Sequence, residues 1–134
     1  MQITRQSEYA IKTMLELARL PFGQTLRTQE ISQRQEVPEV FLKKTIQLLA
    51  RGGLLATQRG AQGGVRLNLP ADQITVADII EAVEGPLAIN PCLAEGQHCE
   101  KESFCPIRRI LWRAQNAMKT ELSRESLQEI LNER

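Results

Sequence analysis

The segment from Cys92 to Cys105 constrains the fold of this chain more than any other stretch. It holds all three cysteines of the protein and its only histidine, His98, but few large apolar side chains. A segment of this composition cannot form a hydrophobic core, yet ordering it costs roughly 1–2 kcal/mol per residue. Three thiolates that close on one metal centre would offset this cost. We therefore interpret the segment as a ligand loop for an iron–sulfur cluster.

The spacing of the cysteines differs from that of the common metal motifs. Six residues separate Cys92 from Cys99 and five separate Cys99 from Cys105, unlike the closely paired cysteines of structural zinc sites or the compact ferredoxin runs. Three thiolates fit a cluster of two or four irons (2Fe-2S or 4Fe-4S) and leave one position for another ligand, which suits a sensor better than an electron carrier. Zinc with His98 as the fourth ligand is an alternative, and so is a set of three ordinary cysteines.

Composition indicates a soluble globular protein with one domain, or one domain and a helical arm. The 134 residues are 42% hydrophobic and 25% charged, which is ordinary for this class. No apolar run approaches the ~20 residues of a membrane span, and the first residues do not resemble a secretory signal. We therefore expect a cytoplasmic protein with no membrane partner. In that reducing compartment an odd number of cysteines favours metal or redox chemistry over disulfides.

Charge is distributed unevenly along the chain. Residues 1–70 carry ten Lys and Arg against five Glu, a balance of +5, whereas residues 71–134 carry seven basic and eleven acidic residues, a balance of −4. A basic first half favours a polyanion as its partner. The alternative is a chance imbalance on solvated surfaces.

A helix-turn-helix is predicted within the basic half. Thr28 is expected to cap a short helix that ends near Arg34, and Pro38 to be the first residue of a second helix, which ends at Arg51 before Gly52. Two short helices joined by a tight turn match the helix-turn-helix motif. The side chains expected on the buried face of the second helix are Phe41, Leu42, Thr45, Ile46 and Leu49.

A β-hairpin is expected next, with strands over residues 54–59 and 65–69 and a glycine-rich turn between them. A helix-turn-helix followed by a hairpin is a winged helix. Helices are also expected from Thr4 or Ser7 to about residue 20, and from a Thr75 cap with Asp78 to Gly85.

The remaining chain is expected to form a long helix from residues 103–106 to Leu122, with one continuous apolar stripe, and a short last helix capped by Ser123. The long helix is too one-sided to be covered by so small a head, so we expect it to pair with its twin in a homodimer. The predicted fold class is therefore mainly α: a winged helix-turn-helix head with a small β-hairpin wing and a long C-terminal dimerisation helix. The expected domains are a DNA-binding head (1–85), a cysteine cluster-binding loop (86–105) and a dimerisation and C-terminal region (106–134).

Double-stranded DNA is the partner that this architecture predicts. Lysines on the recognition helix neutralise phosphates or reach guanine, a glutamate accepts from cytosine, and a wing arginine enters the minor groove. The candidate DNA-binding residues are Thr28 at the first helix, Glu39, Val40, Lys43, Lys44 and Gln47 on the recognition helix, and Arg59, Gly60, Gly63, Gly64 and Arg66 on the wing.

The order of short motifs extends this interpretation over nearly the whole chain. The motifs are residues 1–4 with Tyr9-Ala10, residues 30–32, Leu42 with Ile46, residues 49–54, Arg59-Gly60 with Gly63-Gly64, residues 79–85, and the three cysteines. In this order and spacing the chain resembles the dimeric winged-helix regulators typified by IscR, NsrR and the cluster-free CymR. The resemblance implies a homodimer on the two half-sites of a pseudo-palindromic operator, with Cys92, Cys99 and Cys105 as cluster ligands.

The resemblance also bears on the fourth ligand. Arg108 stands where IscR-like members have a histidine, whereas NsrR-like members look as though they use a first-helix carboxylate of the partner subunit, which here implies Glu8. The leading hypothesis is a repressor that senses iron, redox state or nitric oxide through the cluster. The alternatives are a cluster-free regulator controlled by a partner protein or small molecule, and an electron-transfer protein. No catalytic residues are predicted, because the chain has no paired carboxylates or nucleophile–base pair.

Overall fold

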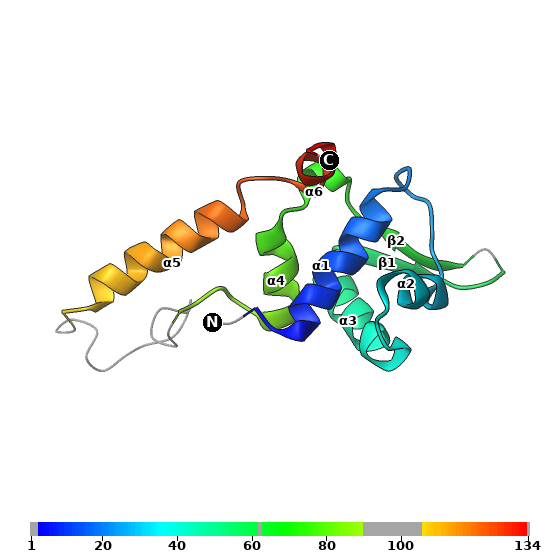
Figure 1. Cartoon of the computed structure of the whole chain (residues 1–134), viewed down its shortest axis with the longest axis horizontal. Coiled ribbons are helices and arrows are strands. Elements are labelled where there is room, and N and C mark those ends of the chain that lie inside the picture. Colours follow the sequence, from blue (N-terminus) through cyan, green and yellow to red (C-terminus); the bar gives the residue numbers. More distant parts are fainter. Residues whose placement is uncertain (1–2, 62, 90–105, 134) are drawn as a thin grey trace.

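The computed structural model describes residues 3–61, 63–89 and 106–133, and within them it has the mainly α, winged-helix architecture that the sequence predicts. Figure 1 shows a head made of several packed helices and a hairpin, with one helix, α5, extending from it as an arm. The elements are α1 (Arg5–Ala18), α2 (Thr28–Gln35), α3 (Glu39–Arg51), β1 (Leu55–Gln58), β2 (Gly64–Leu67), the 3-10 turn η1 (Ala71–Gln73), α4 (Val76–Glu84), α5 (Arg108–Leu122) and α6 (Leu127–Asn132).

Helix α1 runs through the centre of the head (Figure 1). Thr4 caps it, because the Thr4 hydroxyl accepts a hydrogen bond from the Ser7 N–H at 3.2 Å. Ala10, Met14 and Leu17 recur at helical spacing and are buried against the rest of the core. Helix α1 therefore packs against both α3 and α4.

The turn between α2 and α3 is set by Glu36, whose φ of 53° and ψ of 42° are left-handed. The Ser32 hydroxyl donates to the Val37 carbonyl at 2.5 Å, and the Val37 N–H donates to the Ser32 carbonyl at 3.1 Å. Pro38 was predicted as the first residue of α3, but its ψ of 132° is extended, and it precedes the helix as the N-cap. Thr28, predicted as a cap, is the first residue of α2 instead.

The wing is a two-stranded antiparallel sheet in which Leu55 lies opposite Leu67 and Thr57 opposite Val65. Its strands are shorter than predicted. The chain before α2 extends the sheet, because Leu26 and Val65 exchange two backbone hydrogen bonds of 2.7 and 2.9 Å. The wing is thereby fastened to the helix-turn-helix by backbone pairing, with Leu55, Val65 and Leu67 buried beneath it.

The short helix α6 returns to the head and completes its core. Leu127 is fully buried, and its N–H donates to the Ile74 carbonyl at 2.9 Å. Ser126 caps this helix by accepting from the Glu129 N–H at 3.2 Å. The predicted cap, Ser123, is wrong because its backbone is still helical and it ends α5.

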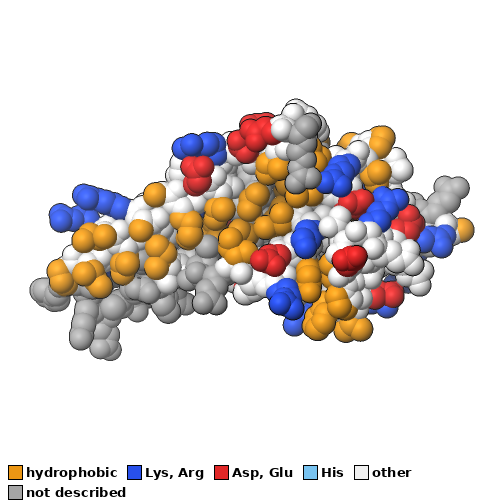
Figure 2. All heavy atoms as spheres, viewed as in Figure 1, with side chains coloured by type: hydrophobic (Ala, Val, Ile, Leu, Met, Phe, Trp, Pro, Cys, Tyr) orange, Lys and Arg blue, Asp and Glu red, His pale blue; other side chains and the backbone are white. Residues whose placement is uncertain are grey.

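Helix α5 begins at Arg108, later than predicted, and packs against α4. Its apolar stripe is divided between two environments. Leu111, Met118 and Leu122 are half-buried, and Leu122 packs against the head, whereas Ile107, Ile110, Ala114 and Ala117 are exposed. Figure 2 shows hydrophobic side chains along most of this arm. In the described part of the chain, no helix has the length and apolar character needed to cross a membrane.

Candidate nucleic-acid interface

Helix α3 presents a polar outer face because its apolar residues recur on the opposite side. Leu42, Thr45, Ile46 and Leu49 are buried, as predicted. The outer face carries the candidate DNA-binding side chains: Val40, Lys43, Lys44 and Gln47 are exposed, and Glu39 is half-buried. The Lys43 Nζ lies 3.8 Å from the Glu39 Oε1, a surface pair that costs little to exchange for a phosphate.

Phe41 corrects the sequence prediction for this helix. It was expected on the buried face, but 58% of it is exposed. Helix geometry explains the error, because the first turn of α3 extends beyond the core and only Leu42 of that turn reaches it. Two large apolar side chains, Val40 and Phe41, are therefore exposed at the start of the predicted recognition helix.

The wing tip is shaped by glycines that meet their own chain. A Cβ on Gly63 would lie 2.3 Å from the Gln58 carbonyl oxygen, and one on Gly64 would lie 2.5 Å from that of Leu26. These two glycines are candidate DNA-binding residues, and the close approach that the structure shows for them is to the wing's own backbone and to the chain before α2. Arg59 and Gly60 are exposed at the tip, as a minor-groove contact requires, whereas Arg66 is half-buried on β2.

Arg27, the residue before α2, contacts the wing, and sequence reasoning missed it. Its Nη2 donates to the Ala61 carbonyl at 2.6 Å, which ties the residue before α2 to the tip of the hairpin. The two residues are 34 positions apart, so no local pattern pointed to the contact. The contact fixes the distance between the helix-turn-helix and the wing.

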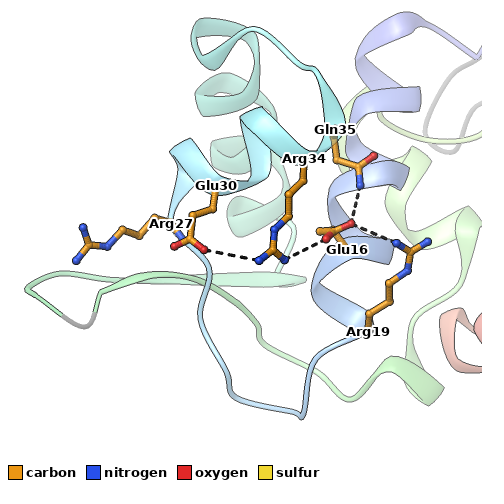
Figure 3. A network of polar contacts seen from close by, with 6 residues as sticks. All are labelled: Glu16, Arg19, Arg27, Glu30, Arg34 and Gln35. Atoms are coloured by element: carbon orange, nitrogen blue, oxygen red, sulfur yellow. Dashed lines mark hydrogen bonds and ion pairs between the residues drawn. The ribbon is translucent and has the colours of Figure 1, made fainter.

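The buried carboxylate of Glu16 connects α1 to α2 of the helix-turn-helix. Figure 3 shows Glu16 of α1 pointing toward Arg34 and Gln35 of α2. Its oxygens accept from the Gln35 Nε2 at 2.6 Å, the Arg34 Nη1 at 3.2 Å and the Arg19 Nη1 at 3.4 Å. Glu16 is only 8% exposed, but it lies on the side of α1 away from the Ala10–Met14 stripe, so no apolar pattern in the sequence pointed to it. These contacts, the Glu16 brace, hold α2, and through it α3, against α1.

The start of α1 is tied to the end of α4. The Ser7 hydroxyl donates to the Glu84 Oε1 at 2.8 Å, and the Thr4 hydroxyl bonds to the same oxygen. A carboxylate in this position also favours the positive end of the α1 dipole. Glu8, the predicted fourth cluster ligand, lies one residue further along and is exposed, so a second subunit has access to its side chain.

The three cysteines, with His98, lie outside the described residues, in the segment that joins α4 to α5. Where the chain enters this segment, the Ile89 N–H donates to the Oε1 of the buried Gln115 of α5 at 3.0 Å. Arg108, at the start of α5, lies over the Trp112 ring at 5.8 Å from the centroid. Among the described residues, no His, Cys, Asp and Glu side chains group as a metal site would require.

Comparison with known proteins gives a consistent result over nearly the whole chain. The family described as "Rrf2: Iron-dependent Transcriptional regulator" matches residues 3–133. Protein aau3 of Rhizobium meliloti is 37% identical over 119 residues, which are 87% of this chain and 76% of that protein.

Two solved structures have the same fold along their length. CymR, the global cysteine regulator of B. subtilis, superposes with a TM-score of 0.79 and is 27% identical, with 100% of this chain and 98% of that chain covered. IscR of T. potens superposes with a TM-score of 0.77 and is 25% identical, with 99% and 88% covered.

Proposed function

The chain belongs to the Rrf2 family of transcriptional regulators, and from this premise we propose that it is a homodimeric repressor that senses its signal through an iron–sulfur cluster. The family resemblance predicted from the sequence is confirmed, as is the winged-helix fold. The operator, the dimer and the cluster are the further parts of the proposal. Each is supported by a different feature of the molecule.

DNA binding is supported by the outer face of α3 beside the wing. Lys43, Lys44 and Gln47 are exposed on one helix, and Arg59 is exposed at the hairpin tip. Residues near the start of a recognition helix contact base edges in the major groove, while a wing arginine suits the narrow minor groove. The Gln35–Glu16 contact and the Arg27–Ala61 contact hold α3 and the wing in a fixed relation to each other. This exposed basic face is the single observation on which the proposed function depends most.

Dimer formation is supported by the exposed half of the α5 stripe. Ile107 and Ile110 are 55% and 58% exposed, and Ala114 and Ala117 continue the same face. Small residues beside large ones allow two helices to approach closely. Two arms paired along this face would carry two heads to the two half-sites of a pseudo-palindromic operator.

The cluster is supported by the donor set. Cys92, Cys99 and Cys105 provide three soft thiolates, the ligand type that iron–sulfur clusters use. In this proposal, Glu8 of the second subunit provides the fourth ligand. A bound cluster would supply iron that responds to oxidant, nitric oxide or iron supply. The protein itself connects the cysteine segment to the arm and to the head. The Ile89–Gln115 hydrogen bond connects it to α5, and the Glu84 contacts connect the end of α4 to α1.

One experiment tests the cluster and the operator separately. Untagged full-length protein is purified without oxygen, and its absorption spectrum, iron and acid-labile sulfide are measured. Visible absorption with cluster stoichiometry is expected, and both should be lost when the three cysteines are changed to serine. Glu8→Gln should change the spectrum or accelerate cluster loss, whereas Glu30→Gln, a half-buried carboxylate in the first turn of α2, should not.

Operator binding is measured on the same preparations. Lys44→Gln should lower affinity and reduce the slope of log affinity against log salt by about one. Arg124→Gln is the matched control, because Arg124 is exposed beyond the end of α5 and pairs only with Glu121 among the described residues. Equal salt slopes for the two variants would contradict the proposed orientation of α3.

A second candidate is favoured by the likeness to CymR of B. subtilis, which covers the whole of this chain. In this alternative the chain binds its operator without a cluster, and a partner protein or small molecule provides the signal. Metal-free protein whose operator affinity is the same before and after the three Cys→Ser changes would select it. Loss of operator affinity along with the cluster would exclude it.

A further inference from the structure

Two neighbouring apolar side chains at the start of α3 are not explained by phosphate contacts. Val40 is 79% exposed and Phe41 is 58% exposed, although both belong to a helix whose other large apolar residues are buried or half-buried. The helix start is not loose, because the Thr45 hydroxyl donates to the Phe41 carbonyl at 2.9 Å and the Leu42 N–H donates to the Pro38 carbonyl at 3.0 Å. The two side chains are therefore held outward on a rigid helix.

Phe41 forms one wall of a groove of about 580 Å³ between α1 and α3. Arg5, Gln6 and Tyr9 line it from α1, and Pro38, Val40 and Lys44 line it with Phe41 from the other side. Figure 2 shows hydrophobic side chains gathered at the lower edge of the head, where Figure 1 places the starts of α1 and α3, with Lys and Arg side chains beside them. The surface is thus apolar at its centre and cationic at its rim.

The apolar and cationic groups of this groove together indicate which kind of partner it binds. Arg5 and Lys44 at the groove edge favour a polyanion. A polyanion that also offers apolar groups to a helix is B-DNA, whose major groove displays the C5-methyl group of each thymine. An uncharged lipid or an apolar peptide would cover the two apolar side chains but would leave the cations at the rim without a counter-charge.

We propose that Phe41, with Val40 beside it, reads thymine methyl groups in the operator, an inference that rests on the proposed function as a DNA-binding protein. The lysines and Gln47 on the same helix then position α3 and read polar base edges. Phe41 adds specificity at positions where hydrogen bonds alone distinguish bases less well. It is a specificity-determining residue that the sequence pattern had assigned to the core.

The test removes one methyl group at a time. An operator is selected from a random duplex pool with the full-length protein, and each thymine is then replaced by uracil, which changes only the C5-methyl group. For the wild-type protein, one or two thymines per half-site should weaken binding by about fourfold when replaced, as expected for about 0.8 kcal/mol per buried methyl-sized group. For Phe41→Ala, the same replacements should have no effect. Phe41→Leu should restore part of the thymine preference.

The control and the contrary outcomes separate this inference from the proposed function. Phe22 is 60% exposed and follows the opposite end of α1 from the groove, so Phe22→Ala should leave thymine preference unchanged. If a specific operator is bound but no uracil replacement weakens it, or the replacements weaken it equally for Phe41→Ala, the inference is overturned and the proposed function stands. If no sequence is enriched and Lys44→Gln changes nothing, both are overturned. Thermal unfolding of each variant verifies that affinity losses do not come from misfolding.

Discussion

Replacing Glu16 by alanine tests whether the contacts of Glu16 between α1 and α2 stabilise the winged-helix head. Glu16 of α1 is buried and accepts from three side chains, two of them on α2 (Figure 3). Its removal leaves Gln35 without its acceptor, leaves Arg34 with its longer 3.9 Å pair to Glu30, and leaves a gap under α2. Because α2 supports the turn into α3, the loss should reach the predicted recognition helix.

The expected magnitude follows from the exposure of the three donors. The contact of Gln35 Nε2 with Glu16 Oε2 is short, 2.6 Å, and a hydrogen bond to a charged group contributes about 1.5–3 kcal/mol. The arginines have side chains 48% exposed, so solvent screening limits each to roughly 0.5 kcal/mol. Glu16→Ala should therefore lower the free energy of unfolding by about 2.5–4 kcal/mol. Glu16→Gln, which keeps one acceptor oxygen and the shape, should cost about 1–2 kcal/mol.

Urea unfolding followed by circular dichroism, at one protein concentration for all variants, measures these differences. Arg19→Ala is the matched control, because it removes the longest contact and leaves Glu16 paired with α2. It should cost no more than about 0.5 kcal/mol. The loss in Glu16→Ala should persist at high salt, since a buried contact is screened little. The reasoning is refuted if Glu16→Ala costs no more than Arg19→Ala, or if its cost disappears at high salt.

Three further predictions concern the wing, the arm and the C-terminal carboxylates. Gly64→Ala should destabilise the protein by about 1–2 kcal/mol more than Gly53→Ala in urea unfolding, because both positions have positive φ but only the Gly64 Cβ would meet backbone. Ile110→Glu should shift the protein from dimer to monomer in sedimentation, whereas Asn116→Glu, on the other face of α5, should not. The pKa of Glu125 is raised above 4.5, first by repulsion from Glu133 and then by desolvation. The folded chain thus binds this proton more tightly than the unfolded chain, so its contribution to stability grows as pH falls through the raised pKa. Glu125→Gln should flatten the stability profile in that window, and an unchanged profile would contradict this assignment.

The elements that could be predicted from the sequence are those whose signals are local. The Thr75 and Asp78 capping box is present as expected, with the Thr75 N–H donating to the Asp78 Oδ2 at 3.0 Å. Helical spacing identified Leu42, Ile46 and Leu49 as buried residues of α3, and the glycine run identified the hairpin. Caps, helical spacing and turn glycines depend on contacts between residues a few positions apart, so they can be recognised from the sequence alone.

The errors and omissions come from contacts between distant parts of the chain. Phe41 has the spacing of a core residue, but its side chain lines an open groove between α1 and α3. The Arg27–Ala61 and Glu16–Gln35 contacts join residues 34 and 19 positions apart, and no periodicity reports such pairings. Similarly, the α5 stripe was continuous in sequence, but its division into a covered and an exposed half depends on where α4 lies.

The same contacts limit how a signal from the proposed cluster would be transmitted to the proposed DNA-binding face. The head is held together by its core, by the Glu16 brace and by the pairing of Leu26 with Val65, so a small force at its edge cannot readily deform it. The arm, by contrast, packs against α4 and is tied at Ile89. A tilt of about 10° at one end of a helix about 22 Å long moves its other end by about 4 Å. In a dimer joined through α5, such a tilt changes the spacing of the two α3 helices against half-sites one helical turn, roughly 34 Å, apart. A change in the proposed cluster would therefore act on operator affinity by moving rigid heads relative to each other.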